Sequence, residues 1–182
     1  NTTIGNAGFA DVDALIAAYT ALVTPVTSAL TTATDNLVGT ASGDTFTGTF
    51  GTGATMTAAD TIIDSTTTDA DTLTLTGAAF ANSADTSIAT ITNIETINIV
   101  FDTLTNATID AAGISTSATI NASNVRSGSG AALTVTNVTD GSTLNISNFN
   151  TVTNATADAG GDMTLNANAA TGSVRGTVST DG

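Results

Sequence analysis

The stretch "DNLVGTASGDTF", residues 35–46, contains one short pattern twice. An aspartate, a small polar residue and a large apolar residue occur at residues 35–37 and again, nine residues later, at residues 44–46. Gly39 and Gly43 lie between the two copies. Glycine-rich turns that alternate with short strands are typical of a chain that winds into stacked coils, in which each apolar residue points inward.

The same triplet recurs at residues 60–62, 71–73 and 102–104. From residue 72 onward, short segments with period-two alternation follow one another, each ending in Asn, Asp, Gly or Ser. We expect strands in residues 72–76, 89–100, 107–109, 118–122, 132–138, 143–147, 152–158, 163–168 and 173–178.

This pattern predicts an all-β fold, namely a calcium-stapled right-handed parallel β-helix or β-roll solenoid. A β-sandwich is the alternative, because strands that recur every eight to twelve residues also suit that fold. Aromatic residues make up only 4% of the chain, too few to fill a thick sandwich core. Thr and Asn at equivalent places of successive coils would form side-chain ladders.

The chain divides into three segments by composition. Residues 8–23 carry apolar residues at steps of three and four and end before Pro25, which predicts one short N-terminal helix. We therefore assign residues 1–32 to an N-terminal helical segment that caps or links the rest. Residues 33–76 form calcium-binding coils, and residues 77–182 form a Thr/Asn-rich β-helix.

Charge and composition exclude several classes of protein. The formal net charge is −14, with 16 acidic residues and only two basic ones, so the surface repels nucleic acid phosphate. No run of 18 apolar residues is present, and we expect no membrane insertion.

Histidine and lysine are absent, which leaves few general bases, and we expect no enzymatic activity. Without Cys or His, only oxygen ligands remain, and these suit Ca²⁺.

We expect the aspartates of the Gly/Asp/Thr-rich segment to bind Ca²⁺, together with neighbouring amide and backbone oxygens. The candidate ligands are Asp35, Asn36, Gly39, Gly43, Asp44, Asp60, Asp64, Asp69 and Asp71. The alternative is that these aspartates only form turns through Asx hydrogen bonds. Glu95, the sole glutamate, is expected to cap a strand or to bind Ca²⁺, and the later aspartates are expected in solvated turns.

The segment "GTASGDTF" resembles a degenerate RTX nonapeptide, Gly-Gly-x-Gly-x-Asp-x-apolar-x, with Thr40 and Ser42 in place of two glycines. The successive stretches "TDNLVGTASGDTF", "ADTIIDSTTTDADTLTLTG" and "ITNIETINI" resemble a module of bacterial surface-layer proteins of the RTX-related, Caulobacter/Campylobacter type. The resemblance covers roughly residues 31–100. It implies a Ca²⁺-dependent parallel β-helix, type I secretion and assembly into a two-dimensional lattice.

On this basis we expect a structural protein of an extracellular surface array, located at the cell surface and self-associating into a lattice or filament. Cell-surface polysaccharide is a further expected partner. The alternative is an RTX-type adhesin or other extracellular binding module. Ice binding by Thr-x-Thr arrays such as residues 72–76 would need a regular Thr grid, and the spacing along the sequence is uneven.

Overall fold

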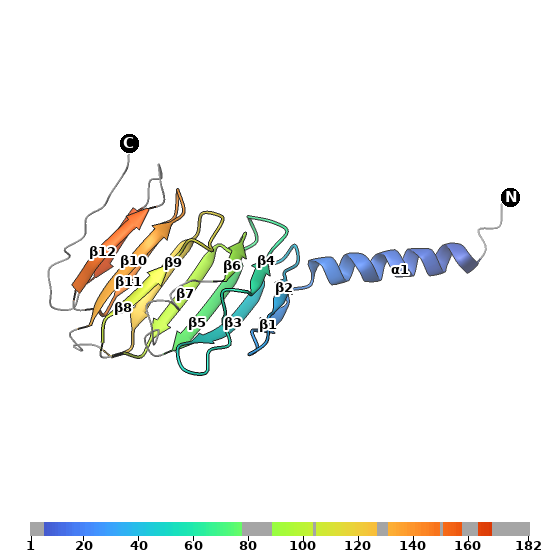
Figure 1. Ribbon diagram of the computed structural model, residues 1–182. Helices are drawn as coiled ribbons and strands as arrows, with labels where there is room; N and C mark the ends of the chain where they lie inside the picture. The colour runs from blue at the N-terminus through green and yellow to red at the C-terminus, as the bar shows by residue number, and fades with distance from the viewer. Residues whose placement is uncertain are drawn as a thin grey trace.

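The computed structural model describes residues 6–77, 89–103, 105–126, 131–149, 151–157 and 164–168. A single helix, α1 (Asn6–Val23), extends away from a stack of short parallel strands (Figure 1). The strands are β1 (Thr27–Ala29), β2 (Asn36–Val38), β3 (Thr45–Phe50), β4 (Thr61–Ile63), β5 (Thr72–Gly77), β6 (Thr90–Thr92), β7 (Thr96–Phe101), β8 (Ala107–Asp110), β9 (Thr119–Asn124), β10 (Ala132–Val138), β11 (Thr143–Ser147), β12 (Thr151–Ala157) and β13 (Thr164–Asn168).

The strands form three sheets in which every described pair is parallel. One sheet has the order β1-β3-β5-β7-β9-β11-β13, and the other two have the orders β2-β4-β6 and β12-β10-β8. The chain therefore leaves each odd-numbered strand, passes through another sheet and returns one layer further along. This arrangement is a parallel β-solenoid, which confirms the predicted parallel β-helix or β-roll and rules out the sandwich.

The coil is longer than the nine-residue repeat of the sequence. Val26 and Asp44 occupy equivalent positions 18 residues apart, and the later coils take 21 to 27 residues along the seven-stranded sheet. Two nine-residue steps thus make the first coil, and longer loops enlarge the coils that follow. As a result, Asp35 precedes β2 and Asp44 precedes β3, which lie in different sheets.

The repeated triplet has the structural role that its pattern predicts. In the copies at residues 35–37, 44–46, 60–62 and 71–73, the aspartate directly precedes a strand. The third residue points inward: Phe46, Ile62 and Leu73 are fully buried, and Leu37 packs against the core. Asp102 follows a strand instead, so that copy does not share the role.

The interior is built from columns of apolar side chains that repeat from coil to coil. Phe46, Leu73, Ile97, Ile120 and Leu144 are register partners on successive strands and are all fully buried. Three phenylalanines form a second column: Phe50 and Phe101 meet edge to face at 5.0 Å, and Phe101 and Phe149 at 5.5 Å. Edge-to-face contacts of this kind stabilise the core beyond the effect of the buried apolar area.

The outer face of the seven-stranded sheet carries polar columns without charge. Its first column consists of threonines that are register partners, namely Thr27, Thr45, Thr72, Thr96, Thr119 and Thr143. Beside it, Asn145 donates to Asn121 (2.8 Å) and Asn121 donates to Asn98 (2.9 Å). The expected ladder is therefore present, and loops of unequal length still return the threonines to one regular column.

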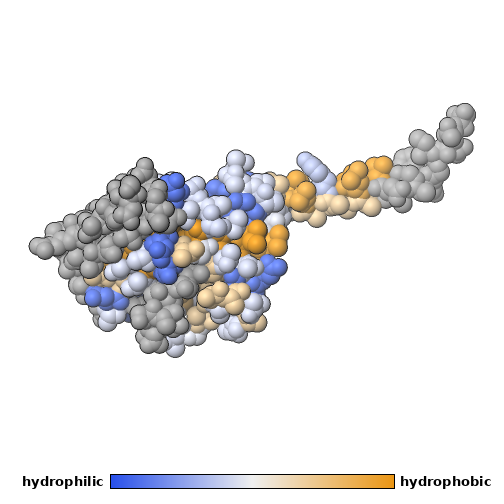
Figure 2. Space-filling view, turned by 45° about the horizontal axis from the view of Figure 1, so that its top comes forward, coloured by the Kyte–Doolittle hydropathy of each residue, from blue (hydrophilic) through white to orange (hydrophobic). Residues whose placement is uncertain are grey.

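Helix α1 is joined to the first coil at its C-terminal end. The backbone N–H of Ala41 donates to the carbonyl of Leu22, and the Ser42 hydroxyl donates to the carbonyl of Val23. The apolar residues Val12, Leu15, Ile16, Tyr19 and Leu22 are each at least 51% exposed, and apolar colour runs along the helix in Figure 2. No described helix is long and apolar enough to cross a membrane.

Two sequence expectations differ in detail from the structure, and a third lies outside the described residues. Strand β1 lies within residues 1–32, the segment assigned to the helix, so the first coil begins before residue 33. Residues 89–100 form two strands, β6 and β7, because Asn93 has a φ of 56° and turns the chain between them. The strand expected at residues 173–178 lies outside the described residues.

Asp60 offers a direct test of how aspartates hold the coils together. Its fully buried carboxylate accepts hydrogen bonds from the backbone N–H groups of Asp35 (2.8 Å) and Thr57 (2.6 Å). We expect Asp60→Ala to lower the free energy of unfolding by roughly 2–4 kcal/mol, because two inward N–H groups lose their acceptor. Urea denaturation measures this change.

The matched control is Asp102→Ala. Asp102 pairs with Arg126 at the surface, where both side chains are about half exposed, so its loss should cost about 1 kcal/mol or less. Equal effects of the two substitutions would contradict the role assigned to Asp60.

Candidate metal centre

Acidic residues stack at the position that directly precedes successive strands of the seven-stranded sheet. Asp44, Asp71 and Glu95 precede β3, β5 and β7. Each carboxylate accepts a hydrogen bond from the backbone N–H of the equivalent residue one coil earlier: Val26 donates to Asp44 (2.6 Å), Asp44 to Asp71 (2.6 Å) and Asp71 to Glu95 (2.7 Å). The three acids thus form a column of negative charge, which we call the acid column.

The loop between β4 and β5 adds two more carboxylates. Asp64 directly follows β4, and its Oδ2 accepts from the backbone N–H of Thr66 (2.5 Å). Asp69 lies two residues before Asp71, and the positive φ of Ala70 (73°) turns the backbone between them. A non-glycine residue in this conformation indicates that its surroundings hold the turn in place.

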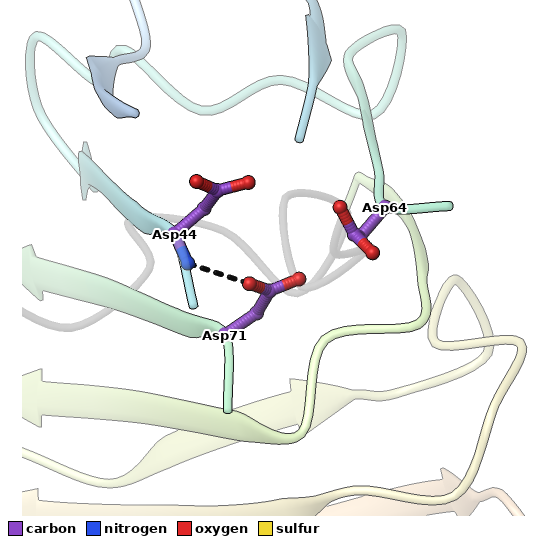
Figure 3. Close-up of side chains that lie close together, drawn as sticks. All are labelled: Asp44, Asp64 and Asp71. Atoms are coloured by element: carbon purple, nitrogen blue, oxygen red, sulfur yellow. Dashed lines mark hydrogen bonds between the residues drawn. The ribbon is translucent and has the colours of Figure 1, made fainter. Parts of the chain in front are cut away.

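These side chains form two groups whose carboxylate oxygens lie within 4.8 Å of one another. The first group is Asp44, Asp64 and Asp71, all buried, and the second is Asp69, Asp71 and Glu95. Figure 3 shows the first group, in which the carboxylates of Asp44 and Asp64 face the same space as that of Asp71. Ca²⁺ binds oxygen at 2.3–2.6 Å, so oxygens at these separations suit one ion per group.

Several oxygen atoms of the centre are buried without a hydrogen-bond partner. Within the described part of the chain they are Asp64 Oδ1, Thr66 Oγ1, Asp69 Oδ1, Asp69 Oδ2 and Asp71 Oδ2. A buried oxygen left unpaired costs free energy, and the cost is greater for a charged group. Carboxylate and hydroxyl oxygens are the donors that a hard divalent cation prefers.

Gly39 and Gly43 are required by the close approach of the next coil. A Cβ at Gly39 would lie 2.3 Å from Asp64 Oδ1 and 2.6 Å from Asp44 Oδ2, so this glycine borders the first group. A Cβ at Gly43 would lie 2.6 Å from the carbonyl oxygen of Asp69. Both glycines, expected as backbone ligands, make room for the carboxylates and the loop.

Burial of Asp71 raises the pKa of its carboxyl to about 7. The nearby charges of Asp64, Asp69 and Glu95 raise this pKa further. The hydrogen bond from the Asp44 N–H lowers it in part. A cation bound beside Asp71 would favour the ionised form, because an opposite charge within a few ångströms lowers the pKa of an acid.

Besides the two glycines, three of the residues expected as ligands lie outside both groups. The carboxylate of Asp35 accepts from the N–H and hydroxyl of Thr31. The amide oxygen of Asn36 accepts from the Thr61 hydroxyl (2.7 Å). Both oxygens of Asp60 are engaged by backbone N–H groups. The local contacts of Asp35 with Thr31 and of Asp60 with Thr57 match the turn-forming alternative. The contacts of Asn36 with Thr61 and of Asp60 with Asp35 join neighbouring coils instead.

Glu95, expected to cap a strand or to bind Ca²⁺, lies in the second group, although the set of candidate ligands in residues 35–71 did not include it. Residues 95–97, Glu-Thr-Ile, repeat the acid-Thr-apolar triplet of residues 71–73 with glutamate in place of aspartate. This triplet was the signal that places Glu95 in the acid column. The equivalent residues of the next two coils are Ala118 and Ser142, so the acid column ends at Glu95.

Comparison with known proteins gives no family for the chain: no family model, no curated protein and no solved structure matches it.

We expect Ca²⁺ to raise the melting temperature of the protein. At a free concentration about tenfold above Kd, one site contributes roughly 1.4 kcal/mol, or about 3–6 °C for a chain of this size. Differential scanning calorimetry in EDTA and in Ca²⁺ measures the shift. Asp64→Asn should reduce it and Asp102→Asn should leave it unchanged; an identical melt with and without Ca²⁺ would contradict a stabilising cation.

The raised pKa of Asp71 predicts a pH dependence in Ca²⁺-depleted buffer. The pKa of Asp71 in the folded chain lies above its value of about 4 in the unfolded chain. Between about pH 4 and about pH 7, the folded chain therefore keeps a proton that the unfolded chain has already lost, and the free energy of unfolding falls as the pH rises. The free energy of unfolding should therefore be larger at pH 5 than at pH 7.5, as measured by urea denaturation. Asp71→Asn should show a smaller difference, and an unchanged difference in that variant would assign the effect to other acids.

Proposed function

We propose that this protein is a structural component of an extracellular surface array, such as a bacterial surface layer, whose coils are stabilised by Ca²⁺. The observation that carries the proposal is the set of buried, unpartnered carboxylate oxygens in the acid column and the adjoining loop. A rod of stacked coils that needs cations to neutralise its interior acids suits a location where Ca²⁺ is abundant. Extracellular Ca²⁺ sites bind with Kd values of about 10⁻⁴–10⁻³ M.

Two surface features support self-association in particular. The exposed apolar side chains of helix α1, including Leu15 and Tyr19, form the kind of patch that is usually covered by another protein surface. The outer face of the seven-stranded sheet is uncharged on a chain of net charge −14, so two copies meet there with less repulsion than elsewhere. Export by type I secretion and attachment to cell-surface polysaccharide belong to the same proposal.

A second candidate function is an extracellular binding module of the adhesin type. The regular column of threonines from Thr27 to Thr143 favours it, because a flat array of hydroxyls can bind a repetitive hydrated surface such as a glycan or ice. The Thr-x-Thr segments are unevenly spaced along the sequence, which spoke against a regular array of threonines. In the folded sheet the threonines nevertheless form one regular column. The two candidates differ in whether the protein assembles with itself.

Electron microscopy of the purified protein with and without Ca²⁺ tests the proposal. We expect sheets or filaments in millimolar Ca²⁺ that disperse in EDTA. An Asp64→Asn, Asp71→Asn double variant should assemble poorly, whereas Asp102→Asn should assemble normally. Monomers under all conditions would contradict the array, and monomers that co-sediment with insoluble polysaccharide or show thermal hysteresis would support the binding module.

A further inference from the structure

The carboxylates of the centre come from three successive layers of the solenoid. Asp44, Asp71 and Glu95 stand one above another at the starts of β3, β5 and β7, and Asp64 and Asp69 join from the intervening loop. Asp71, in the middle layer, belongs to both three-acid groups. The two groups are therefore adjacent along the stacking direction and not alternative descriptions of one site.

Each group has its own buried oxygens that lack a partner. Asp64 Oδ1 belongs to the first group, both oxygens of Asp69 belong to the second, and Asp71 Oδ2 belongs to the residue that the groups share. Asp64 is only 2% exposed and Asp71 is fully buried, so solvent does not satisfy them. A single ion near Asp44 would leave the Asp69 oxygens unpaired, and a single ion near Glu95 would leave Asp64 Oδ1 unpaired.

The charge balance also favours two cations over one. When ionised, the five carboxylates carry five negative charges, so one divalent ion leaves three of them uncompensated and two ions leave one. Uncompensated like charges at these separations are costly in a buried setting, where the effective dielectric constant is low. The hydrogen bonds from backbone N–H groups offset part of this repulsion but supply no net positive charge.

One member of the second group, Glu95, borders an open hollow. A hollow of about 290 Å³ borders Glu95 and is lined by the hydroxyl-bearing residues Thr67, Ser117, Thr119 and Thr143. Hydroxyl groups and water in this hollow supply further oxygens for an ion that needs six to eight of them. The first group is more enclosed, because Gly39 lies directly against Asp64 Oδ1 and Asp44 Oδ2.

We propose that the centre holds two Ca²⁺ ions bridged by Asp71, one bound by Asp44, Asp64 and Asp71 and the other by Asp69, Asp71 and Glu95. This inference rests on the proposed stabilisation by Ca²⁺ and adds the number of ions and the residue that couples them. The pair joins the layers of β3, β5 and β7, so each ion fastens two neighbouring coils. Asp71 takes part in both fastenings.

Equilibrium dialysis with ⁴⁵Ca²⁺ on the monomeric full chain tests the number of ions through single variants. Glu95→Gln should lose one equivalent of bound Ca²⁺ relative to the wild type, Asp64→Asn should lose one, and Asp71→Asn should lose two. Asp102→Asn, a surface acid outside the centre, should lose none. Circular dichroism confirms that each variant is folded, and the Glu95 and Asp64 variants suffice if Asp71→Asn does not fold.

Energy transfer between lanthanides gives an independent measurement. With Tb³⁺ and Eu³⁺ loaded together, the Tb³⁺ emission of the wild type should be strongly quenched, because two ions sharing a carboxylate lie about 4 Å apart. Glu95→Gln should remove the quenching while one bound Tb³⁺ remains.

The outcomes separate this inference from the proposed function. If a Glu95→Gln, Asp64→Asn double variant loses only one equivalent, or if Glu95→Gln loses none, the two-ion centre is wrong while stabilisation by Ca²⁺ stands. If none of the three substitutions lowers the amount of bound Ca²⁺ relative to the wild type, the centre does not bind Ca²⁺ at all. Loss of array formation is not used as a readout, so a protein that fails to assemble still tests the pair.

Discussion

The structure depends on one repeated contact, in which the carboxylate that precedes a strand accepts a hydrogen bond from the backbone N–H of the coil before it. Asp44, Asp60 and Asp71 all make this contact with donors 18 to 27 residues away in sequence. The contact fixes the register of each new coil, because the acid reaches its donor only when the strands are correctly aligned. It also brings like charges within a few ångströms of one another. The contact that orders the coils therefore creates the demand for positive charge inside a chain that has almost none of its own.

Much of the fold follows from local pattern. The acid-polar-apolar triplets placed strand starts and inward residues correctly at Phe46, Ile62 and Leu73, because each triplet specifies its own geometry without reference to distant parts of the chain. The length of the coil was not predictable in this way. The nine-residue step suggested neighbouring turns, but loops of different length intervene, and strand pairing between coils decides which residues meet. The threonine column illustrates the same effect, since unequal spacing in the sequence becomes regular spacing in the sheet.

The candidate site was predictable in part, for the same reason. Asp44 and Asp71 belong to triplets and lie in the acid column. Asp35 belongs to an equally good triplet, yet its carboxylate turns back to Thr31, because β2 is in a different sheet from β3. Asp64 and Asp69 reach the centre through the path of a loop, which no spacing rule specifies. Glu95 was expected to cap a strand or to bind Ca²⁺, and its triplet, with glutamate in place of aspartate, corresponds to its position in the acid column.

The distribution of acids along the stack implies that the two halves of the solenoid are held together by different forces. Beyond Glu95 the residues that precede the strands are Ala118 and Ser142, and Ser142 fulfils the hydrogen-bonding role with a neutral hydroxyl (3.1 Å). The coils from β7 to β11 rely instead on the asparagine ladder and on the contact between Phe101 and Phe149, neither of which involves charge. Cations bound at the acid column would act on the coils near the helix, whereas the contacts of the later coils involve no group of the proposed metal centre. A solenoid whose coils contact only their neighbours can therefore open at its helix end while the rest stays folded.

Because the exposed helix is attached to that same end, through Leu22 and Val23, the state of the metal centre would also govern how firmly the helix is held for contact with another molecule.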